Sequence, residues 1–584
     1  MRAAKRPRAS AATIEAPKRR LLSPAARRFL LLFASALIVA FYVYGPSLAG
    51  PFVFDDLSFP FALKSTASRP FFAWVNGVRP VLYFSFWLNH ALIGDAPAGF
   101  HVVNVLIHAV SAGLVFFVVL RILGLCAVEE RRRRLLAGAA AGVFLLHPIQ
   151  TESVAYVAGR SESLSAMFAL AAWAVFLYRS SQAISWGRAA AVLVLFGCAC
   201  ATKEHAVALV PVLLLTDYFF NPGFSLEGIR RNWRLYVPLA AGAALAGVVA
   251  WHVIAGAGSA GFEMKNVTWY QYFFTECRMF FIYLRLFFVP VGQTVDYDVP
   301  ISTTIFQHGS LMALIVIICM VGAAFALRRR FPIASFGFLT FLVLLAPTSS
   351  FVPIRDPIVE HRMYLPMLGL ILVVVEPARR LRLSQQTLIW ATSAVLLLSC
   401  VLTYRRSQVW SSPTLVWQDA IAKAPAKARP YENLASVYLR EGRCQQAASL
   451  LRSVAGRVAT GQYFLITWGA AEQCLARYDE AGALLEKAVA IQPDAHAYVL
   501  LGSVRQKQGK VKESLEAFEK AIQLDPNSDV NYLYRGEWYQ SADQFDAAVR
   551  DFRRALEINP NNAMARRFLA EAENRIRQQR GASP

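Results

Sequence analysis

Charged residues are scarce in this chain of 584 residues. They make up 17% of it, whereas hydrophobic residues make up 56%. Soluble globular domains carry about 25% charged residues, so a wholly water-soluble protein is excluded. The scarcity is also uneven, because residues 29–405 hold repeated apolar runs while residues 406–584 have the charged composition of a soluble helical sequence. Two parts are therefore predicted, one in lipid and one in water.

Paired CxxC motifs are absent, although the chain has eight cysteines. Structural zinc sites use such pairs, so no structural zinc is expected. Most of the cysteines fall inside apolar runs, where cysteine behaves as a small hydrophobic residue. Cys444 and Cys474 lie in the soluble part, where either a disulfide in an oxidising compartment or two buried thiols would account for them.

Acidic residues are outnumbered, with 38 Asp and Glu against 60 Lys and Arg, and the formal net charge is +22. A strongly basic protein can attract nucleic acid. Much of this charge, however, lies in short loops between apolar runs, where it orients a membrane protein. Nucleic acid is therefore not an expected partner.

Apolar runs long enough to approach a membrane span recur along the first part of the chain. A bilayer core of about 30 Å needs roughly 20 apolar residues in a helix. About eleven spans are predicted, at 29–49, 100–123, 135–149, 162–179, 187–202, 205–220, 235–256, 309–327, 332–350, 362–377 and 386–405.

One further apolar stretch, 269–290, contains Glu276, Arg278 and Arg285. If it crossed the membrane fully, the Arg328–Arg330 cluster would face outward, against the positive-inside rule. It is therefore predicted to be a re-entrant or interfacial helix.

Basic residues predict the orientation of the spans. The tail at 1–28 is rich in Lys and Arg, so it is placed in the cytoplasm, and the basic clusters of later loops fall on the same side. The first loop, 50–99, which contains the Asp-Asp pair, and the soluble C-terminal part are then outside. Arg405 and Arg406, at the outer end of the last span, are the one basic pair that opposes this orientation.

A repeat with a fixed period occupies the soluble part. The tripeptides IQP, LDP and INP end at Pro493, Pro526 and Pro560, at intervals of 33 and 34 residues. This is the period of the tetratricopeptide repeat, a pair of antiparallel helices. Repeats with a polar capping helix are predicted over 413–579, and such solenoids bind peptides or proteins along a concave face. A spacer or dimerisation role is the alternative.

Ionisable residues gather in the loops predicted to lie outside. Adjacent carboxylates such as Asp55 and Asp56 offer a general base and a cation site. Lysine and arginine beside an apolar groove suit an anionic phosphate, which favours a lipid-phosphate substrate. The other such residues are His147, Glu152, Arg160, Glu162, Lys203, Glu204, His205, Asp296, Asp298, Arg355, Asp356, Glu360, His361, Arg362 and Tyr364.

The order of these motifs resembles the transmembrane and tetratricopeptide-repeat O-mannosyltransferase family. The similarity covers nearly the whole chain, through FVFDD, RPVLYFSFWLNHALIGDAPAGFHVVNVLIHA, HPIQTESVAYVAGRSE, TKEH, EHRMYLP and the terminal repeats. The resemblance implies an all-α protein, with a GT-C glycosyltransferase fold in residues 29–405. It also implies transfer of mannose from a polyprenyl-phosphate carrier to Ser or Thr of a translocated protein, with the repeats binding the acceptor.

The resemblance assigns the first-loop carboxylates to catalysis, so Asp55 or Asp56 is expected to deprotonate the acceptor. No cofactor is firmly expected; a divalent cation at this pair is the one considered. Charge and side of the membrane suggest further residues for the donor phosphate and substrate: His147, Glu152, Arg160, Lys203, Glu204, Glu360, His361, Arg362 and Tyr364.

Composition leaves alternatives open. The chain is rich in Ala and Arg, as in a high-GC bacterium, so a bacterial inner membrane is expected, and both sugar and acceptor stay open. Transfer to a lipid or envelope glycan is one alternative, and a non-enzymatic scaffold that displays the repeats is another. A transporter is disfavoured, because it would need midplane charges and a repeated membrane topology.

Overall fold

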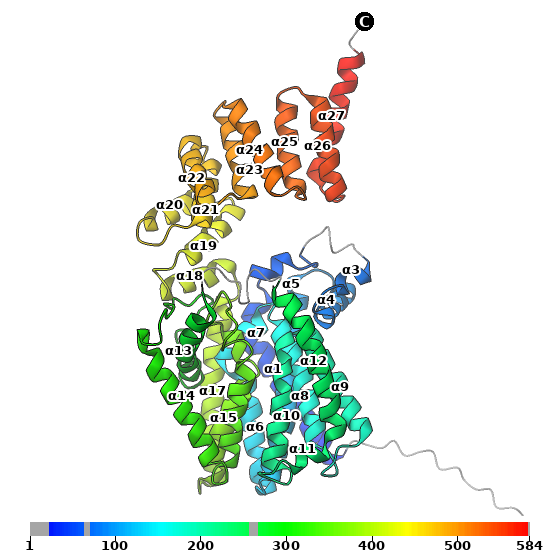
Figure 1. Ribbon diagram of the computed structural model, residues 1–584, viewed down its shortest axis with the longest axis vertical. Helices are drawn as coiled ribbons and strands as arrows, with labels where there is room; N and C mark the ends of the chain where they lie inside the picture. The colour runs from blue at the N-terminus through cyan, green and yellow to red at the C-terminus, as the bar shows by residue number, and fades with distance from the viewer. Residues whose placement is uncertain (1–22, 63–69, 256–266, 582–584) are drawn as a thin grey trace, which may run out of the picture.

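The computed structural model describes residues 23–62, 70–255 and 267–581. Most of the predicted basic tail and a short part of the first outer loop lie outside these residues. The described chain is all-helical, apart from an isolated bridge between Ala455 and Val458. It forms a helical bundle and a curved array of helix pairs above one end of that bundle (Figure 1).

A helix occupies each of the eleven apolar runs, and these helices stand side by side in the bundle (Figure 1). They are α1 Pro24–Leu48, α5 Pro97–Leu125, α6 Glu130–Leu146, α8 Arg160–Leu177, α9 Trp186–Thr202, α10 Leu209–Phe220, α12 Trp233–Ala255, α14 Ser310–Ala326, α15 Pro332–Leu345, α16 Met367–Arg380 and α17 Gln385–Val409.

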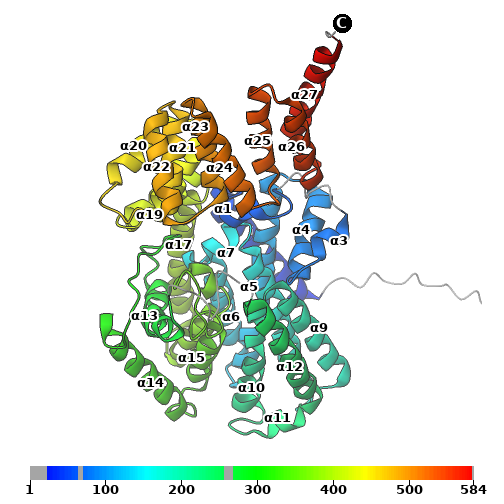
Figure 2. The same cartoon turned by 45° about the horizontal axis from the view of Figure 1, so that its top comes forward.

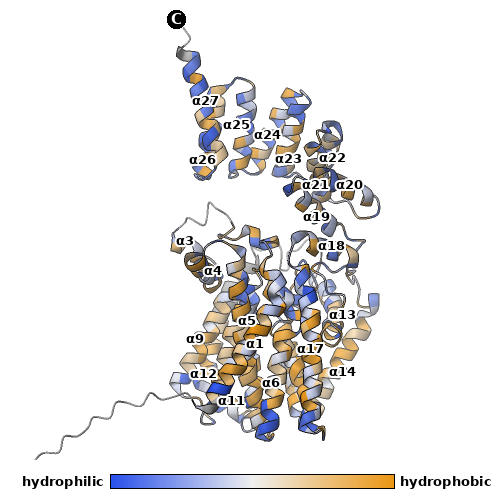
Figure 3. Cartoon of the chain, turned by 180° about the vertical axis from the view of Figure 1, so that it is seen from behind, coloured by the Kyte–Doolittle hydropathy of each residue, from blue (hydrophilic) through white to orange (hydrophobic). Residues whose placement is uncertain are grey.

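Four helices of the described chain are long and apolar enough to cross a bilayer by themselves: Ala26–Leu48, Pro97–Leu125, Gln307–Ala326 and Gln385–Val409. Hydrophobic residues dominate the sides of the bundle, and hydrophilic residues gather at its ends (Figure 3). This distribution suits a protein whose sides face lipid.

The remaining short elements of the membrane domain connect these helices. The first outer loop contains two helices that its sequence did not suggest, α3 and α4. The connecting elements are η1 Phe54–Ser58, α3 Phe71–Val75, α4 Pro80–Ile93, η2 Pro148–Gln150, α7 Thr151–Ala155, η3 Glu204–Ala208, α11 Glu227–Arg231, α13 Trp269–Phe288, η4 Gln307–Gly309 and η5 Glu360–Met363.

The stretch predicted to be re-entrant or interfacial forms the continuous helix α13. Thr268 caps its first turn, and the side chain of Gln271 completes a capping box. On its inner face Phe280 packs against Phe341 of α15, with ring centroids 5.6 Å apart. Helix α13 is therefore held along the bundle and does not lie apart from it.

The array begins directly after α17 and consists of paired helices, as the repeat period predicts. In two successive pairs a glycine faces a phenylalanine ring: Gly502 faces Phe518 and Gly536 faces Phe552. The array helices are α18 Pro413–Lys423, α19 Ala428–Arg440, α20 Cys444–Val454, α21 Gln462–Cys474, α22 Tyr478–Ile491, α23 Ala495–Lys507, α24 Val511–Leu524, α25 Asp529–Ser541, α26 Phe545–Ile558 and α27 Ala563–Gly581.

The array arches over the outer loops, with α25–α27 above α3 and α4 in both views (Figures 1 and 2). Cys444 of α20 and Cys474 of α21 form a disulfide, with their Cα atoms 6.0 Å apart. The disulfide therefore joins the first two pairs of the array.

Helices α15 and α16 pack unusually closely, which gives a test of the bundle. A Cβ atom at Gly337 would lie 2.6 Å from the carbonyl oxygen of Gly369. We expect Gly337→Ala to lower the free energy of unfolding by about 1–3 kcal/mol, because the backbones must separate. Gly322→Ala in α14 is the control, since no atom lies within 4 Å of its Cβ position. Thermal unfolding in detergent measures both, and equal melting temperatures would contradict this close packing.

Candidate functional site

The segment from His147 to Glu162, at the outer end of the bundle, contacts several loops that are far away in the sequence. It contains η2, α7 and the first turn of α8, and residues 147–153 and 157–163 are all buried. We call it the hub segment. Three segments each place a polar group against it: the first outer loop, the TKEH turn at residues 202–205 and the EHRMYLP segment at residues 360–366.

The two carboxylates of the first loop have different environments. Asp56 is completely buried, and its two oxygens accept backbone hydrogen bonds from Val53 at 3.1 Å and Ala158 at 2.7 Å. Asp55 is exposed, and its own N–H donates to the Tyr156 hydroxyl at 2.9 Å. Asp56 therefore ties the loop to the hub segment, whereas Asp55 remains exposed to solvent, with its carboxylate beside the Tyr156 hydroxyl.

Arg160 is also completely buried, and it links the hub segment to α4 and α5. Its guanidinium donates to the side-chain oxygens of Asn104 at 2.7 Å and Asn89 at 2.9 Å, and to two backbone carbonyls. It also lies over the Phe86 ring, 4.6 Å from the centroid. These contacts engage the guanidinium within the protein.

A chain of ion pairs joins the hub segment to the TKEH turn. Glu162 forms a salt bridge with Lys203, and His205 Nε2 lies 3.1 Å from its other oxygen. His361 Nε2 is 3.8 Å from Glu162, so three cationic or titratable groups surround one carboxylate. The side chains of Lys203, His205 and His361 remain 14%, 18% and 26% exposed, so a ligand can reach them.

The same chain continues to the EHRMYLP segment through Glu152. Its Oε1 lies 2.7 Å from His361 Nδ1, and its Oε2 accepts the N–H groups of Glu360 at 3.0 Å and His361 at 3.2 Å. Glu360 is fully buried and accepts from Gln293 and Tyr297, both at 2.8 Å. Burial raises the pKa of the Glu360 carboxyl above its ordinary value.

Three residues predicted to bind donor or substrate are enclosed by other contacts. His147 bonds the carbonyl of Phe287 at 2.9 Å, and the Tyr364 hydroxyl lies 2.7 Å from His108 Nδ1. Arg362 donates to the carbonyls of Asp356 at 2.6 Å and Pro357 at 2.8 Å. His147, Tyr364 and Arg362 are 6%, 1% and 7% exposed, respectively. Because they are buried and bonded to other segments, they hold those segments together.

Glu204 lies at the edge of the group, where it forms a bidentate pair with Arg79 of the first loop at 2.6 and 3.0 Å. Sequence reasoning did not select Arg79 or Tyr156, because their partners could not be inferred from spacing. Both residues lie within motifs that carry the family resemblance, Arg79 in RPVLYFSFWLNHALIGDAPAGFHVVNVLIHA and Tyr156 in HPIQTESVAYVAGRSE.

Each Asp56 oxygen already accepts one backbone hydrogen bond, so a cation at the first-loop carboxylates, which stays a prediction, would have to use the remaining lone pairs of Asp56. Within the described residues there is also no group of three or more His, Cys, Asp or Glu side chains placed to hold a metal ion.

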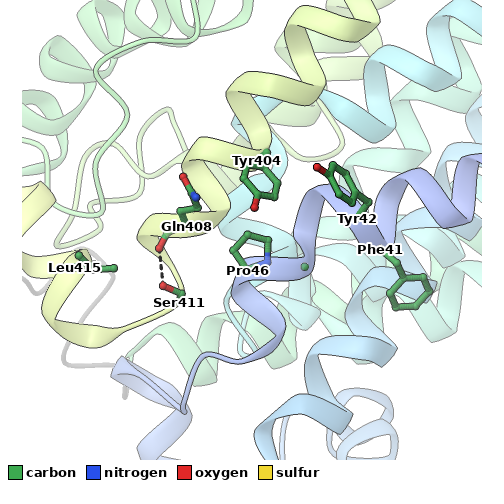
Figure 4. A pocket seen from close by; sticks show the side chains of 8 residues that line it. Phe41, Tyr42, Pro46, Tyr404, Gln408, Ser411 and Leu415 are labelled. Carbon is green, nitrogen blue, oxygen red and sulfur yellow. Dashed lines mark hydrogen bonds between the residues drawn. The ribbon is translucent and has the colours of Figure 1, made fainter.

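A separate cavity of about 750 Å³ opens between the outer ends of α1 and α17 (Figure 4). Tyr42 and Tyr404 stack beside it with ring centroids 5.6 Å apart, and Ser411 donates to the Gln408 carbonyl at 2.7 Å. Its lining contains none of the residues selected from the sequence.

The fold and the site together define a class: an all-helical membrane protein with a polar cluster at its outer end and a C-terminal tetratricopeptide array. The tetratricopeptide repeat family matches residues 495–528 and 531–562. Relatives confirm the resemblance read from the motifs: the chain is related to the transmembrane and tetratricopeptide-repeat protein O-mannosyltransferases.

The protein O-mannosyl-transferase F38B6.6 of Caenorhabditis elegans is 26% identical, over 72% of this chain and 61% of its own length. The human protein O-mannosyl-transferase TMTC3 is 22% identical, over 89% of this chain and 67% of its own. The human protein O-mannosyl-transferase TMTC1 is 25% identical, over 73% of this chain and 54% of its own length. The chain thus spans between about half and two thirds of the length of these relatives.

The solved structures similar to this chain cover less than a third of it. The crystal structure of MamA is 24% identical over 26% of this chain and 88% of its own, with a TM-score of 0.23. The tetratricopeptide protein TTC0263 of Thermus thermophilus is 18% identical over 30% of this chain and 94% of its own, with a TM-score of 0.26.

The buried carboxyl of Asp56 makes stability depend on pH. Burial raises its pKa from 3.8 to about 7, and the backbone hydrogen bonds oppose this only in part. The folded protein therefore holds this proton more tightly than the unfolded chain does, so stability should fall as pH rises from about 4 to about 7. Asp56→Asn loses one hydrogen-bond acceptor, so it should be less stable at every pH. Its stability should also depend less steeply on pH, because Glu360 remains to titrate but residue 56 no longer does. Thermal unfolding at pH 5 and pH 8 compares the two; parallel pH curves would refute the assignment.

Proposed function

We propose that this protein is an integral-membrane glycosyltransferase that moves mannose from a polyprenyl-phosphate donor to Ser or Thr of an exported protein. The observation that carries the proposal is the convergence of the first outer loop, the TKEH turn and the EHRMYLP segment on the hub segment. The relatives are all named protein O-mannosyl-transferases, and this supports the proposed reaction and sugar.

In this proposal Asp55 is the general base. A Ser or Thr hydroxyl is a weak nucleophile at neutral pH, so a carboxylate must take its proton as the oxygen attacks the anomeric carbon. Asp55 is preferred to Asp56 because it is exposed and its carboxylate does not hold the loop in place. Asp56 and Tyr156 fix the backbone on either side of the base.

The departing phosphate is assigned to Lys203, with His205 and His361 beside it. The bond between the anomeric carbon and the phosphate oxygen breaks, and both electrons leave with polyprenyl phosphate, so negative charge grows on that oxygen. Cations placed there lower the barrier. Arg362 is less suited, because it already donates to two backbone carbonyls and lies 3.9 Å from Glu276.

The proposed topology has about eleven spans in a GT-C arrangement, with the N-terminus in the cytoplasm of a bacterial inner membrane and the repeats outside. The distribution of arginine supports it. So does the disulfide in the array, since disulfides persist in oxidising compartments. The array then lies on the side where exported acceptors arrive, and we propose that it binds them.

A reconstituted reaction tests the function. Purified full-length protein is incubated with polyprenyl-phosphate mannose and a Ser/Thr-rich peptide, and the peptide is followed by mass spectrometry. We expect the peptide to gain one hexose per modified hydroxyl. Transfer only to an added lipid or glycan would replace the protein acceptor in the proposal, and no consumption of donor would favour a scaffold.

Loss of the base gives a sharper prediction. We expect Asp55→Asn to lower kcat at least about 100-fold, because general-base catalysis contributes roughly 10²–10⁴-fold. The KM for the lipid donor should change little, since Asp55 is not assigned to the phosphate. Asp543→Asn, an exposed aspartate of the array, is the matched control. Full turnover in Asp55→Asn would exclude this residue as the base.

A further inference from the structure

The residue before the proposed base has an unfavourable backbone conformation. Phe54 has φ +49°, in the left-handed region that bulky L-residues rarely adopt. It begins η1, and Asp55 follows it directly. A conformation of this kind persists only where surrounding contacts impose it. The contacts around the Phe54 ring therefore determine where the Asp55 backbone lies.

Three aromatic rings from different segments surround the Phe54 ring. The nearest belongs to Trp417 of α18, with centroids 4.9 Å apart and ring planes at 89°. Tyr156 of the hub segment follows at 5.6 Å, and Trp410 after α17 at 6.1 Å. All three contacts are edge-to-face, a favourable aromatic geometry. The closest partner of Phe54 thus comes from the first helix of the array.

The hydrophobic core of the array extends into the membrane domain at this point. Trp417 and Ala420 of α18 belong to the same buried cluster as the first helix pair, and Phe54 and Val295 of the outer loops pack against that cluster. The two domains therefore share one packed interior and are not joined by a flexible linker.

Ion pairs fix the same junction from the other side. Arg429, at the start of α19, forms salt bridges with Asp296 and with Asp356, and Lys427 also pairs with Asp296. Asp296 is 1% exposed. Since a buried carboxylate needs its partners, these pairs hold two outer loops of the membrane domain against the array.

Arg406 continues this arrangement into the site. It donates to Asp419 of α18 at 2.8 Å and lies 3.8 Å from Glu360. Both Arg406 and Glu360 are buried. The arginine that opposed the sequence-based orientation is therefore a contact between α18 and the EHRMYLP segment.

We propose that α18 is a structural part of the catalytic centre, in which Trp417 is a positioning residue that holds Phe54 and thereby sets the place of Asp55. Only the role of Asp55 in this inference rests on the proposed function. The contact between Trp417 and Phe54 does not depend on that function. It follows that removal of the Trp417 ring loosens the first outer loop and slows the chemical step, while donor binding at Lys203 is spared.

The test compares three variants of the full-length protein in detergent. Trp417→Ala removes the ring, Trp417→Phe keeps an aromatic contact, and Trp390→Ala removes a tryptophan of α17 that is 67% exposed. Hydrogen–deuterium exchange of residues 50–62 reports the loop without reference to activity, and initial rates give kcat and the KM for polyprenyl-phosphate mannose.

We expect faster exchange at 50–62 in Trp417→Ala alone, with kcat lowered about 10- to 100-fold and KM within about twofold. Misplacement of a reacting group by about 1 Å can cost this much. Trp417→Phe should regain most of the rate, which separates positioning from misfolding. Unchanged exchange in Trp417→Ala would overturn the inference, and so would faster exchange with an unaltered kcat. If the wild type transfers no mannose, the proposed function fails, while the exchange data still decide whether α18 holds the loop.

Discussion

A charged side chain that is buried away from water needs a hydrogen-bond or ion-pair partner. This requirement determines how the loops at the outer end of the helical bundle pack together. Glu162, Glu152 and Asp56 are all buried in or against the hub segment, where an unpaired carboxylate would be costly. Several of their partners lie far away along the chain, such as Lys203 for Glu162 and His361 for Glu152. These ion pairs and hydrogen bonds hold the loops together in a cluster of mixed charge.

The same constraint divides two neighbouring aspartates into different tasks. Asp56 satisfies two backbone N–H groups and is removed from solvent, so it stabilises the loop. Asp55 is exposed, and its carboxylate is the one that we propose as the base. The array then becomes relevant to the site, because Trp417 packs on the residue that precedes this carboxylate. Acceptor binding and catalysis are thus mechanically connected in the proposed enzyme.

Sequence reasoning located the elements better than their contacts. The eleven apolar runs are all helices, and the Pro493, Pro526 and Pro560 period marks helix pairs with glycine facing phenylalanine. Helices α3 and α4 were missed, since a stretch between two spans offers no clear period. Arg160 and Arg362 resembled phosphate ligands by charge and side alone, yet both donate to groups of the protein itself. Charge patterns identify which residues gather at one side, but not which of them already have partners.

The amino-acid sequence is enough to predict the helical class, the division into an apolar and a soluble part, the repeats and the relationship to the O-mannosyltransferases. These properties follow from composition, periodicity and motif order, which are local along the chain. Folding, in contrast, buries Asp56 among backbone N–H groups, places Arg406 between α18 and Glu360, and lets the array share its core with the first outer loop. The physical reason is that burial and hydrogen bonding depend on residues brought together by folding, and spacing along the chain does not specify those partners.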